Sequence, residues 1–264
     1  MIHPTAIIHP KARLDSTVQI GPGVVIDEGV ELGADCIVGP HVYLTGLTTI
    51  GARNRFHAGS VIGDAPQDLK YDGTPTRLRI GTDNVFREHV TVHRSTKVDE
   101  ETIIGAHNYL MASSHIGHNS RLGDHVILAN GVLLGGYAQV DDRAFLGGNA
   151  MVHQFTRVGT LALMRGGSGA SQDLPPFTIV RGINHLCGLN IVGLRRAGMS
   201  AADRLELKRL YRCLFLSGKN LRAALLQAQT EFTGASAQAL LRFVAESKRG
   251  VCTPCDDFAA GAGE

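Results

Sequence analysis

The sequence of 264 residues contains no tryptophan, and aromatic side chains make up only 5% of it. Large aromatic rings dominate the cores of many globular proteins, so a core of that kind is not expected here. Glycine, in contrast, is abundant at 32 residues. A chain rich in glycine, valine, isoleucine and leucine but poor in aromatics indicates a repetitive β architecture rather than a mixed globular core.

Other absences exclude further classes of protein. The formal net charge is only +2, which gives no reason to expect a protein that binds nucleic acid. No apolar run approaches the roughly 18 residues that a membrane span needs. The start, MIHPTAIIHP, lacks the basic and apolar regions of a secretory signal. We therefore expect a cytoplasmic protein without a transmembrane segment.

The five cysteines are odd in number and scattered along the chain, which does not fit a disulfide framework. Cys252 and Cys255 form a single CxxC pair near the C-terminus. A structural zinc site needs two more ligands, so we expect no metal there.

Apolar residues recur at every sixth position along most of the chain. When the sequence is cut into blocks of six from Ala6, the third residue of each block is apolar and the fourth is often glycine. An amphipathic helix repeats its apolar stripe about every 3.6 residues, and a strand alternates at every second residue, so neither explains the pattern alone. The third positions are Ile8, Leu14, Ile20, Ile26, Leu32, Val38, Leu44, Ile50, Phe56, Ile62, Ile80, Phe86, Val92, Ile104, Leu110, Ile116, Leu122, Leu128, Leu134, Val140, Leu146, Val152, Val158, Met164 and Ala170.

This period predicts short strands joined by tight turns, with one apolar side chain of each strand in a narrow shared core. Three blocks per coil give a triangular prism, and stacking of the coils buries what one coil cannot bury alone. Glycines at the fourth position, such as Gly21 and Gly33, are expected to supply the backbone freedom of the turns. The predicted fold class is mainly β, a parallel hexapeptide-repeat β-helix.

The repeat has two interruptions and an end. Polar segments at 64–77 and 95–102 are expected to form loops, since stacked repeats expel their insertions. The repeat stops near Asp173, and the segment 173–198 is interpreted as a connecting strand and turn. Three helical patterns follow, and Ser200 with Asp203 resembles a capping box before the first of them. We expect a β-helix over 1–190, a small helical domain over 191–250 and a disordered tail over 251–264.

Residues 18 apart are expected to stack on one face of successive coils, which brings polar residues together. His118 is then level with Gly136 and Gln154, while His153 falls in the adjacent column. A neutral imidazole is a good general base, and the N–H of a glycine is open to a reacting oxygen. The pair predicts acyl transfer. Because no Ser or Cys shows a triad pattern, we expect direct transfer rather than a covalent intermediate. Four histidines at other phases are expected to be solvated corner residues: His41, His57, His107 and His125.

Several motifs in their order resemble the UDP-N-acetylglucosamine acyltransferase family: PQDLKY (66–71), VTVHRST (90–96), HIGHN (115–119), GGNAMVHQF (147–155), SQDLPPF (171–177) and GLNIVGLRRAG (188–198). The likeness covers about residues 1–250. It implies a left-handed β-helix and the transfer of a 3-hydroxyacyl chain to the 3-hydroxyl of the sugar, which is the first step of lipid A biosynthesis.

The resemblance also implies a role for individual residues. His118 matches the general base and Gly136 the glycine whose N–H holds the oxyanion. Gly166 matches the residue that limits acyl-chain length. The remaining matches contact substrate: Gln67, Asp68 and Lys70 in the first loop, His115 and His153 in the cleft, and Asn190 and Arg196 at the nucleotide diphosphate.

The same resemblance implies the assembly and the partners. Family members are homotrimers with a site between neighbouring subunits. The acyl donor is a thioester on the phosphopantetheine of acyl carrier protein, and no other cofactor or metal is implied. Because this carrier is acidic, Arg165, Arg195 and Arg196 are candidates for binding it, although the last two could equally be a solvated helix edge.

Three positions differ from the family pattern. Asn119 stands where many members have Asp after the base, and an amide orients a histidine without compensating its positive charge. Tyr137 stands in place of another cleft histidine, and Val192 in place of a glutamate. Asn119 and Tyr137 are still expected to contact the substrate site.

The sequence is also compatible with other functions. The acceptor could be the 3-amino analogue of the sugar, and the chain could be another hexapeptide-repeat acyl- or acetyltransferase. A γ-type carbonic anhydrase with zinc on His93, His115 and His118 is conceivable, as is a purely structural β-helix.

Overall fold

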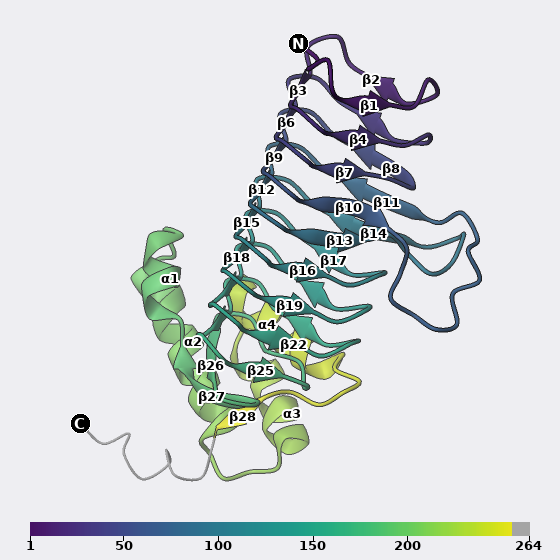
Figure 1. The fold of residues 1–264 in the computed structure, drawn as a ribbon. Helices are drawn as coiled ribbons and strands as arrows, with labels where there is room; N and C mark the ends of the chain where they lie inside the picture. The colour runs from purple at the N-terminus through teal and green to yellow at the C-terminus, as the bar shows by residue number, and fades with distance from the viewer. Residues whose placement is uncertain (255–264) are drawn as a thin grey trace.

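A computed structural model describes residues 1–254. Three sheets of mostly parallel strands form the sides of a prism, and helices cover its C-terminal end (Figure 1). Followed from the N-terminus, the chain passes from β1 to β2 and then behind the prism to β3, so the coils wind left-handed as the family resemblance implied. The predicted fold class is thus confirmed.

Within the repeat, up to β25, each sheet collects every third strand. The first sheet comprises β1 (Ile7–Ile8), β4 (Val25–Ile26), β7 (Tyr43–Leu44), β10 (Val61–Asp64), β13 (Thr91–His93), β16 (His115–Ile116), β19 (Leu133–Leu134), β22 (Met151–Val152) and β25 (Gly169–Ala170). The second comprises β2 (Arg13–Leu14), β5 (Glu31–Leu32), β8 (Leu47–Ile50), β11 (Arg77–Ile80), β14 (Glu101–Ile104), β17 (Arg121–Leu122), β20 (Gln139–Val140) and β23 (Arg157–Val158). The third comprises β3 (Gln19–Ile20), β6 (Ile37–Val38), β9 (Arg55–Phe56), β12 (Val85–Phe86), β15 (Tyr109–Leu110), β18 (Ile127–Leu128), β21 (Phe145–Leu146), β24 (Leu163–Met164), β26 (Thr178–Arg181), β27 (His185–Leu189) and β28 (Thr253–Pro254).

The third residue of nearly every block is buried in the prism. Ile26 is 1% exposed and Leu44 0%, and burying each such side chain contributes about 1.5–3 kcal/mol. Ile8 and Leu14, in the first coil, are only partly buried against this core. The end coil of a solenoid has a neighbour on one side alone, so its core positions stay more open.

The fourth-position glycines have a different role from the one predicted. The left-handed backbone falls on the sixth position of the block, where Asp35 has φ 57° and His41 has φ 54°. At Gly33 the constraint is space, because an added Cβ would lie 2.8 Å from the carbonyl carbon of Gly51 in the next coil. These glycines therefore allow the close approach of successive coils rather than the turn itself.

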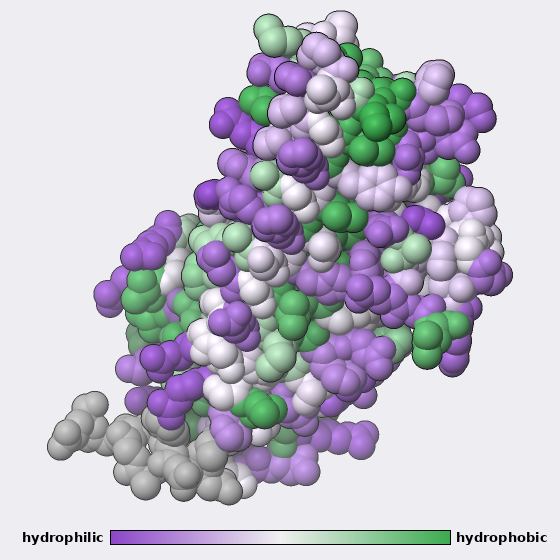
Figure 2. Space-filling model, in the orientation of Figure 1, coloured by the Kyte–Doolittle hydropathy of each residue, from purple (hydrophilic) through white to green (hydrophobic). Residues whose placement is uncertain are grey.

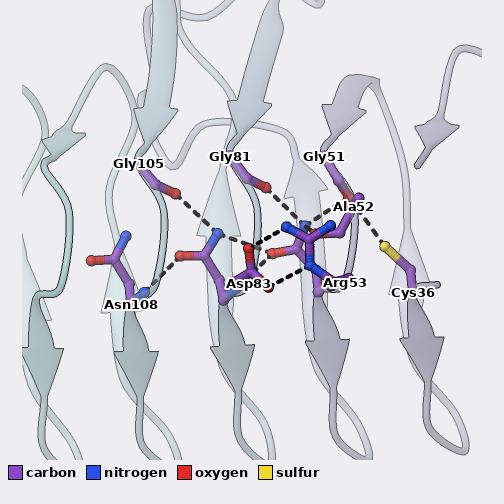
Figure 3. A network of polar contacts seen from close by, with 10 residues as sticks. Cys36, Gly51, Ala52, Arg53, Gly81, Asp83, Gly105 and Asn108 are labelled. Atoms are coloured by element: carbon purple, nitrogen blue, oxygen red, sulfur yellow. Dashed lines mark hydrogen bonds and ion pairs between the residues drawn. The ribbon is translucent and has the colours of Figure 1, made fainter. Parts of the chain in front are cut away.

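Asparagines fill one inner corner of the prism, between the second and third sheets (Figure 3). The Asn54 Oδ1 atom accepts hydrogen bonds from both the backbone N–H (3.0 Å) and the Nδ2 (2.9 Å) of Asn84. The Asn84 Oδ1 accepts in turn from the backbone N–H of Asn108 at 2.9 Å, and its Nδ2 donates to the carbonyl of Gly105 at 2.9 Å. This ladder gives buried backbone groups their hydrogen-bond partners across coils.

Both interruptions leave the prism at the corner between the first and second sheets, where Figure 1 shows two loops projecting sideways. Strand pairing steps by 18 residues at His115–Leu133, but Val61 pairs with Thr91 and Thr91 with His115 because each insertion lengthens one coil. The second loop is shorter than predicted, since β14 already begins at Glu101.

The segment after the repeat is more regular than the predicted strand and turn. It contains the antiparallel hairpin of β26 with β27 and a six-residue helix, α1 (Ile191–Arg196), which the sequence interpretation missed. Three helices follow: α2 (Ala201–Phe215), α3 (Leu221–Glu231) and α4 (Ala235–Ala245). The Ser200 hydroxyl caps α2 by accepting from the N–H of Asp203 at 3.0 Å, as predicted.

The tail prediction was wrong for residues 251–254. Val251 and Cys252 are buried, at 4% and 0% exposure, and β28 pairs with β27. The rest of the predicted tail, including Cys255 of the CxxC pair, lies outside the described residues. No helix in residues 1–254 is long and apolar enough to span a membrane.

Candidate active site

A cleft beside the histidines lies on the outer surface of the first sheet and has a volume of about 870 Å³. Its wall includes His93 at the end of β13, His115 on β16 and His153 after β22. Gln67 from the first loop lines it as well. Figure 2 shows apolar side chains recurring along this face between hydrophilic ones. The cleft therefore combines polar groups at one corner with an apolar surface beside it.

His118 and Gly136 stack as the 18-residue period predicted. The backbone N–H of Tyr137 donates to the carbonyl of His118 at 2.9 Å, which fixes the two coils in register. A Cβ added to Gly136 would lie 2.5 Å from Cε1 and 2.6 Å from Nε2 of His118. The imidazole thus lies directly against a bare stretch of backbone that no other residue type would provide.

The backbone N–H of Gly136 is available to a ligand. Within residues 1–254 it donates no hydrogen bond, whereas the neighbouring N–H groups of Gly135 and Tyr137 both do. An unshielded N–H beside a base is the arrangement needed to stabilise an oxyanion while a proton is removed.

Asn119 fixes the tautomer of His118. Its side-chain Oδ1 accepts hydrogen bonds from the backbone N–H and the hydroxyl of Thr96, both at 3.0 Å. Because a backbone N–H can only donate, this atom is the amide oxygen. The Nδ1 of His118 lies 2.9 Å from the same oxygen and therefore carries a proton. The Nε2, which faces Gly136, is then the basic atom of the neutral ring.

His115 and His93 form a second pair in the cleft. Their rings meet edge to face with centroids 4.9 Å apart, and Nδ1 of His115 lies 2.8 Å from the hydroxyl of Thr91. Burial, followed by the neighbouring His93 and His118, lowers the pKa of His115 to about 4. Burial also lowers the pKa of His93. Both rings are neutral at physiological pH, so they offer hydrogen bonds rather than charge to the cleft.

The structure brings only part of the predicted substrate set to this cleft. Tyr137 contacts His118 edge to face at 5.6 Å between centroids. Asp68 caps its own loop by accepting from the N–H of Lys70 at 2.9 Å, and neither residue lines the cleft of this chain. Gly166 is exposed at the corner between the third and first sheets and also lies outside the cleft lining.

Asn190 and Arg196 line a separate groove of about 620 Å³ over the third sheet, together with Val192. The side chain of Asn190 makes two hydrogen bonds within the fold. Its Oδ1 accepts from the N–H of Gly193 at 3.0 Å, and its Nδ2 donates to the carbonyl of Leu161 at 2.9 Å. Within one chain these residues do not meet His118. Contact of Asn190 with a diphosphate stays a prediction.

Sequence reasoning missed four polar residues around the histidines: Thr91, His93 as a cleft residue, Thr96 and Glu100. Thr91 and His93 stand in the quoted motif VTVHRST. Their position beside His115 in the first sheet would have followed if the 18-residue spacing had been corrected for the insertion. Thr96 and Glu100 lie on the second loop, whose path no period describes.

A solenoid of hexapeptide coils with an imidazole beside an open backbone N–H at one corner is the arrangement expected of a hexapeptide-repeat acyltransferase. Comparisons with known proteins give the family. The sequence matches the family model described as bacterial transferase hexapeptide over 11–46 and 101–136. It also matches the model described as UDP N-acetylglucosamine O-acyltransferase, domain 2, over 173–252.

Individual relatives agree with these matches. The acyl-[acyl-carrier-protein]–UDP-N-acetylglucosamine O-acyltransferase of Syntrophobacter fumaroxidans is 46% identical over 95% of this chain and 98% of its own length. That of Myxococcus xanthus is 40% identical with the same coverage. The crystal structure of the Francisella novicida UDP-N-acetylglucosamine acyltransferase superposes with a TM-score of 0.94 at 31% identity, covering 100% of this chain and 99% of that one.

The chain belongs to the UDP-N-acetylglucosamine O-acyltransferase family, and it is an acyltransferase. This places it apart from the carbonic anhydrases and from purely structural β-helices. Among residues 1–254, no group of three or more His, Cys, Asp or Glu side chains is arranged to hold a metal ion.

Proposed function

We propose that this protein transfers a 3-hydroxyacyl chain from acyl carrier protein to the 3-hydroxyl of UDP-N-acetylglucosamine, the first step of lipid A biosynthesis. The relatives are named as O-acyltransferases that use acyl-[acyl-carrier-protein] and UDP-N-acetylglucosamine. The observation that carries the proposal for this chain is the imidazole of His118 lying against Gly136, whose backbone N–H is unshielded.

In the proposed reaction, Nε2 of His118 removes the proton of the sugar hydroxyl as its oxygen attacks the thioester carbonyl. The N–H of Gly136 donates to the oxyanion of the tetrahedral intermediate. Collapse of this intermediate breaks the carbon–sulfur bond. The departing thiolate of the phosphopantetheine takes the proton from the imidazolium, and the base is regenerated. No covalent acyl-enzyme and no cofactor beyond the carrier's own group are required.

We further propose that the site is completed in a homotrimer. The cleft of His118 and the groove of Arg196 lie on different sheets of one chain. A three-fold assembly would set the first sheet of one subunit against the third sheet of the next. Apolar side chains exposed on these sheets fit such an interface: Leu133 (45%), Met151 (50%) and Phe145 (37%). Exposed apolar area of this kind marks interaction surfaces.

A mixing experiment tests the shared site. His118→Ala and Arg196→Ala subunits are inactive or weak alone, but dissociated and reassembled together they form trimers in which some sites carry neither substitution. Recovered activity in the mixture supports the assembly, whereas a mixture no more active than its parents contradicts it.

Product analysis by mass spectrometry tests the reaction and the acceptor. The enzyme is offered acyl carrier protein loaded with 3-hydroxyacyl and plain acyl chains, and either UDP-N-acetylglucosamine or its 3-amino analogue. The proposal predicts an ester on the 3-hydroxyl, formed fastest from a 3-hydroxyacyl donor. If the only product is an amide on the amino sugar, the acceptor is the 3-amino analogue and not UDP-N-acetylglucosamine. The cytoplasmic location stays a prediction.

A further inference from the structure

The hydrogen bonds around Asn119 continue past the base to a carboxylate. The Nδ2 of Asn119 donates to Oε2 of Glu100 at 2.6 Å, while its Oδ1 faces Nδ1 of His118 at 2.9 Å. The backbone N–H of Asn119 donates to the hydroxyl of Thr102 at 2.7 Å, which holds the residue in place. His118, Asn119 and Glu100 thus form one continuous chain of hydrogen bonds from the second loop to the base.

We propose that Glu100 is a positioning residue that acts through Asn119 and supplies the negative charge that stabilises His118 when it becomes protonated during transfer. This inference rests on the proposed role of His118 as the base. An amide alone orients the ring but carries no charge. A carboxylate bound to the far side of that amide adds the missing charge through a charge-assisted hydrogen bond.

The surroundings keep Glu100 ionised. The pKa of its carboxyl is held below its usual range, chiefly by a hydrogen bond from Lys97 and further by Tyr137 and Asn119, against a smaller opposing effect of burial. The Nζ of Lys97 lies 2.9 Å from Oε1 of Glu100, the oxygen that Asn119 does not use. One oxygen thus pairs with Lys97, and the other accepts from Asn119, which in turn contacts His118.

The other titratable groups around His118 come from the first sheet and the next coil. They are His115 and His93, which are neutral at physiological pH, and Tyr137. Asp64 at the end of β10 and Arg94 directly after β13 act on His93 in opposite directions, and Lys97 offsets part of the charge of Glu100. Glu100 is the carboxylate that hydrogen-bonds into the network of the base.

The arrangement makes a specific prediction about the substitution Asn119→Asp. The new carboxylate would still accept from Thr96 and His118, but its second oxygen would replace the Nδ2 that now donates to Glu100 at 2.6 Å. Two carboxylates at that separation cannot both be ionised without a large penalty. The further substitution Glu100→Gln would remove the conflict, since the amide N–H of the glutamine would donate to the new carboxylate.

The test compares Glu100→Gln, Asn119→Asp and the double variant by kcat, KM and pH profile. Glu100→Gln keeps the hydrogen bond and loses the charge. We expect a kcat about tenfold lower, an unchanged KM, and an acid limb of the kcat/KM profile displaced to lower pH by about one unit. The displacement is downward because the protonated ring loses a stabilising charge, so it gives up its proton more readily.

For Asn119→Asp we expect a kcat about 100-fold lower, and for the double variant a return to within about threefold of the wild type, because the charge has moved one residue closer to the base. Glu101→Gln is the matched control. It removes the same charge from the next residue, whose carboxylate instead pairs with Arg79 at 3.0 Å, and should leave kcat and the pH profile unchanged.

The proposal is overturned if Glu100→Gln keeps the wild-type kcat and pH profile, if the double variant loses as much as the two single losses combined, or if Glu101→Gln produces the same changes. NMR titration of the His118 ring provides a readout that needs no turnover, and the ring should titrate at lower pH in Glu100→Gln than in the wild type. An inactive wild-type enzyme would contradict the proposed function, while this titration would still decide whether Glu100 acts on His118.

Discussion

A methyl group at position 136 is the smallest change that separates the base from the oxyanion donor. In Gly136→Ala the new Cβ would stand 2.5 Å from Cε1, 2.6 Å from Nε2 and 3.1 Å from Nδ1 of His118. Favourable contacts between carbon atoms lie at about 3.5–4.0 Å, so the ring must move by roughly 1 Å. The backbone conformation at Gly136 is not left-handed, so alanine fits the chain and the effect falls on the site.

The expected loss follows from two effects. A displacement of about 1 Å of a catalytic group costs on the order of 100-fold in rate. The N–H of residue 136 is kept but shielded by the methyl group, which costs at most the roughly 10²–10³ in kcat of a lost oxyanion donor. Both arise from the same methyl group, so they do not simply multiply. We expect kcat for Gly136→Ala to fall by about 10³, with a small change in KM, in an assay of product formation by mass spectrometry.

Gly148→Ala is the matched control for this substitution. Gly148 also lies at a corner of the first sheet, but a Cβ there would meet only the carbonyl oxygen of Asn130 at an ordinary 3.5 Å. This variant should keep its activity and its melting temperature. If Gly136→Ala retains more than half of the wild-type kcat, the N–H of Gly136 and the ring of His118 do not act together as described.

Three further predictions concern chain length, pH and the core. Gly166→Leu should shorten the preferred acyl chain in a competition of donors of different length, and an unchanged preference would remove Gly166 as the length-limiting residue. Because the pKa of His115 is lowered to about 4, the unfolded chain binds one more proton between about pH 6.5 and pH 4. Stability should therefore fall as pH falls through this window, and calorimetry should show a shallower fall in His115→Gln, whereas equal slopes would contradict the shift. Asn84→Ala leaves buried partners of the ladder unsatisfied. The free energy of unfolding measured in urea should therefore fall by about 3 kcal/mol or more. An unchanged free energy of unfolding would show that the ladder is dispensable.

The stacked part of the molecule could be predicted from the sequence because the same six-residue period describes every coil. The period of six predicts the burial of Ile116 and Leu134, and multiplying it by three places His118 over Gly136. The role of the fourth-position glycines could not be read in the same way. The sequence shows that Gly33 is small, but only the three-dimensional structure shows that Gly51 of the next coil occupies the space of its Cβ.

The parts that escaped prediction lie where the period is interrupted. Thr96 and Glu100 reach Asn119 through a loop whose path depends on its own hydrogen bonds. The short helix α1 has one turn and a half and gives almost no periodic signal, and Asn190 is recognisable as its cap only once the helix is seen. Arg196 on α1 cannot be joined to the cleft of His118 from the sequence, because within one chain the two residues line separate hollows.

The most direct measurement of the central claim is the rate of acyl transfer by His118→Ala. General base catalysis contributes about 10²–10⁴ in rate, so the account predicts a fall of that size in kcat with the wild-type circular dichroism spectrum and the wild-type oligomeric mass. A variant that folds and assembles normally and still transfers the acyl chain within a few-fold of the wild-type rate would show that His118 is not the base.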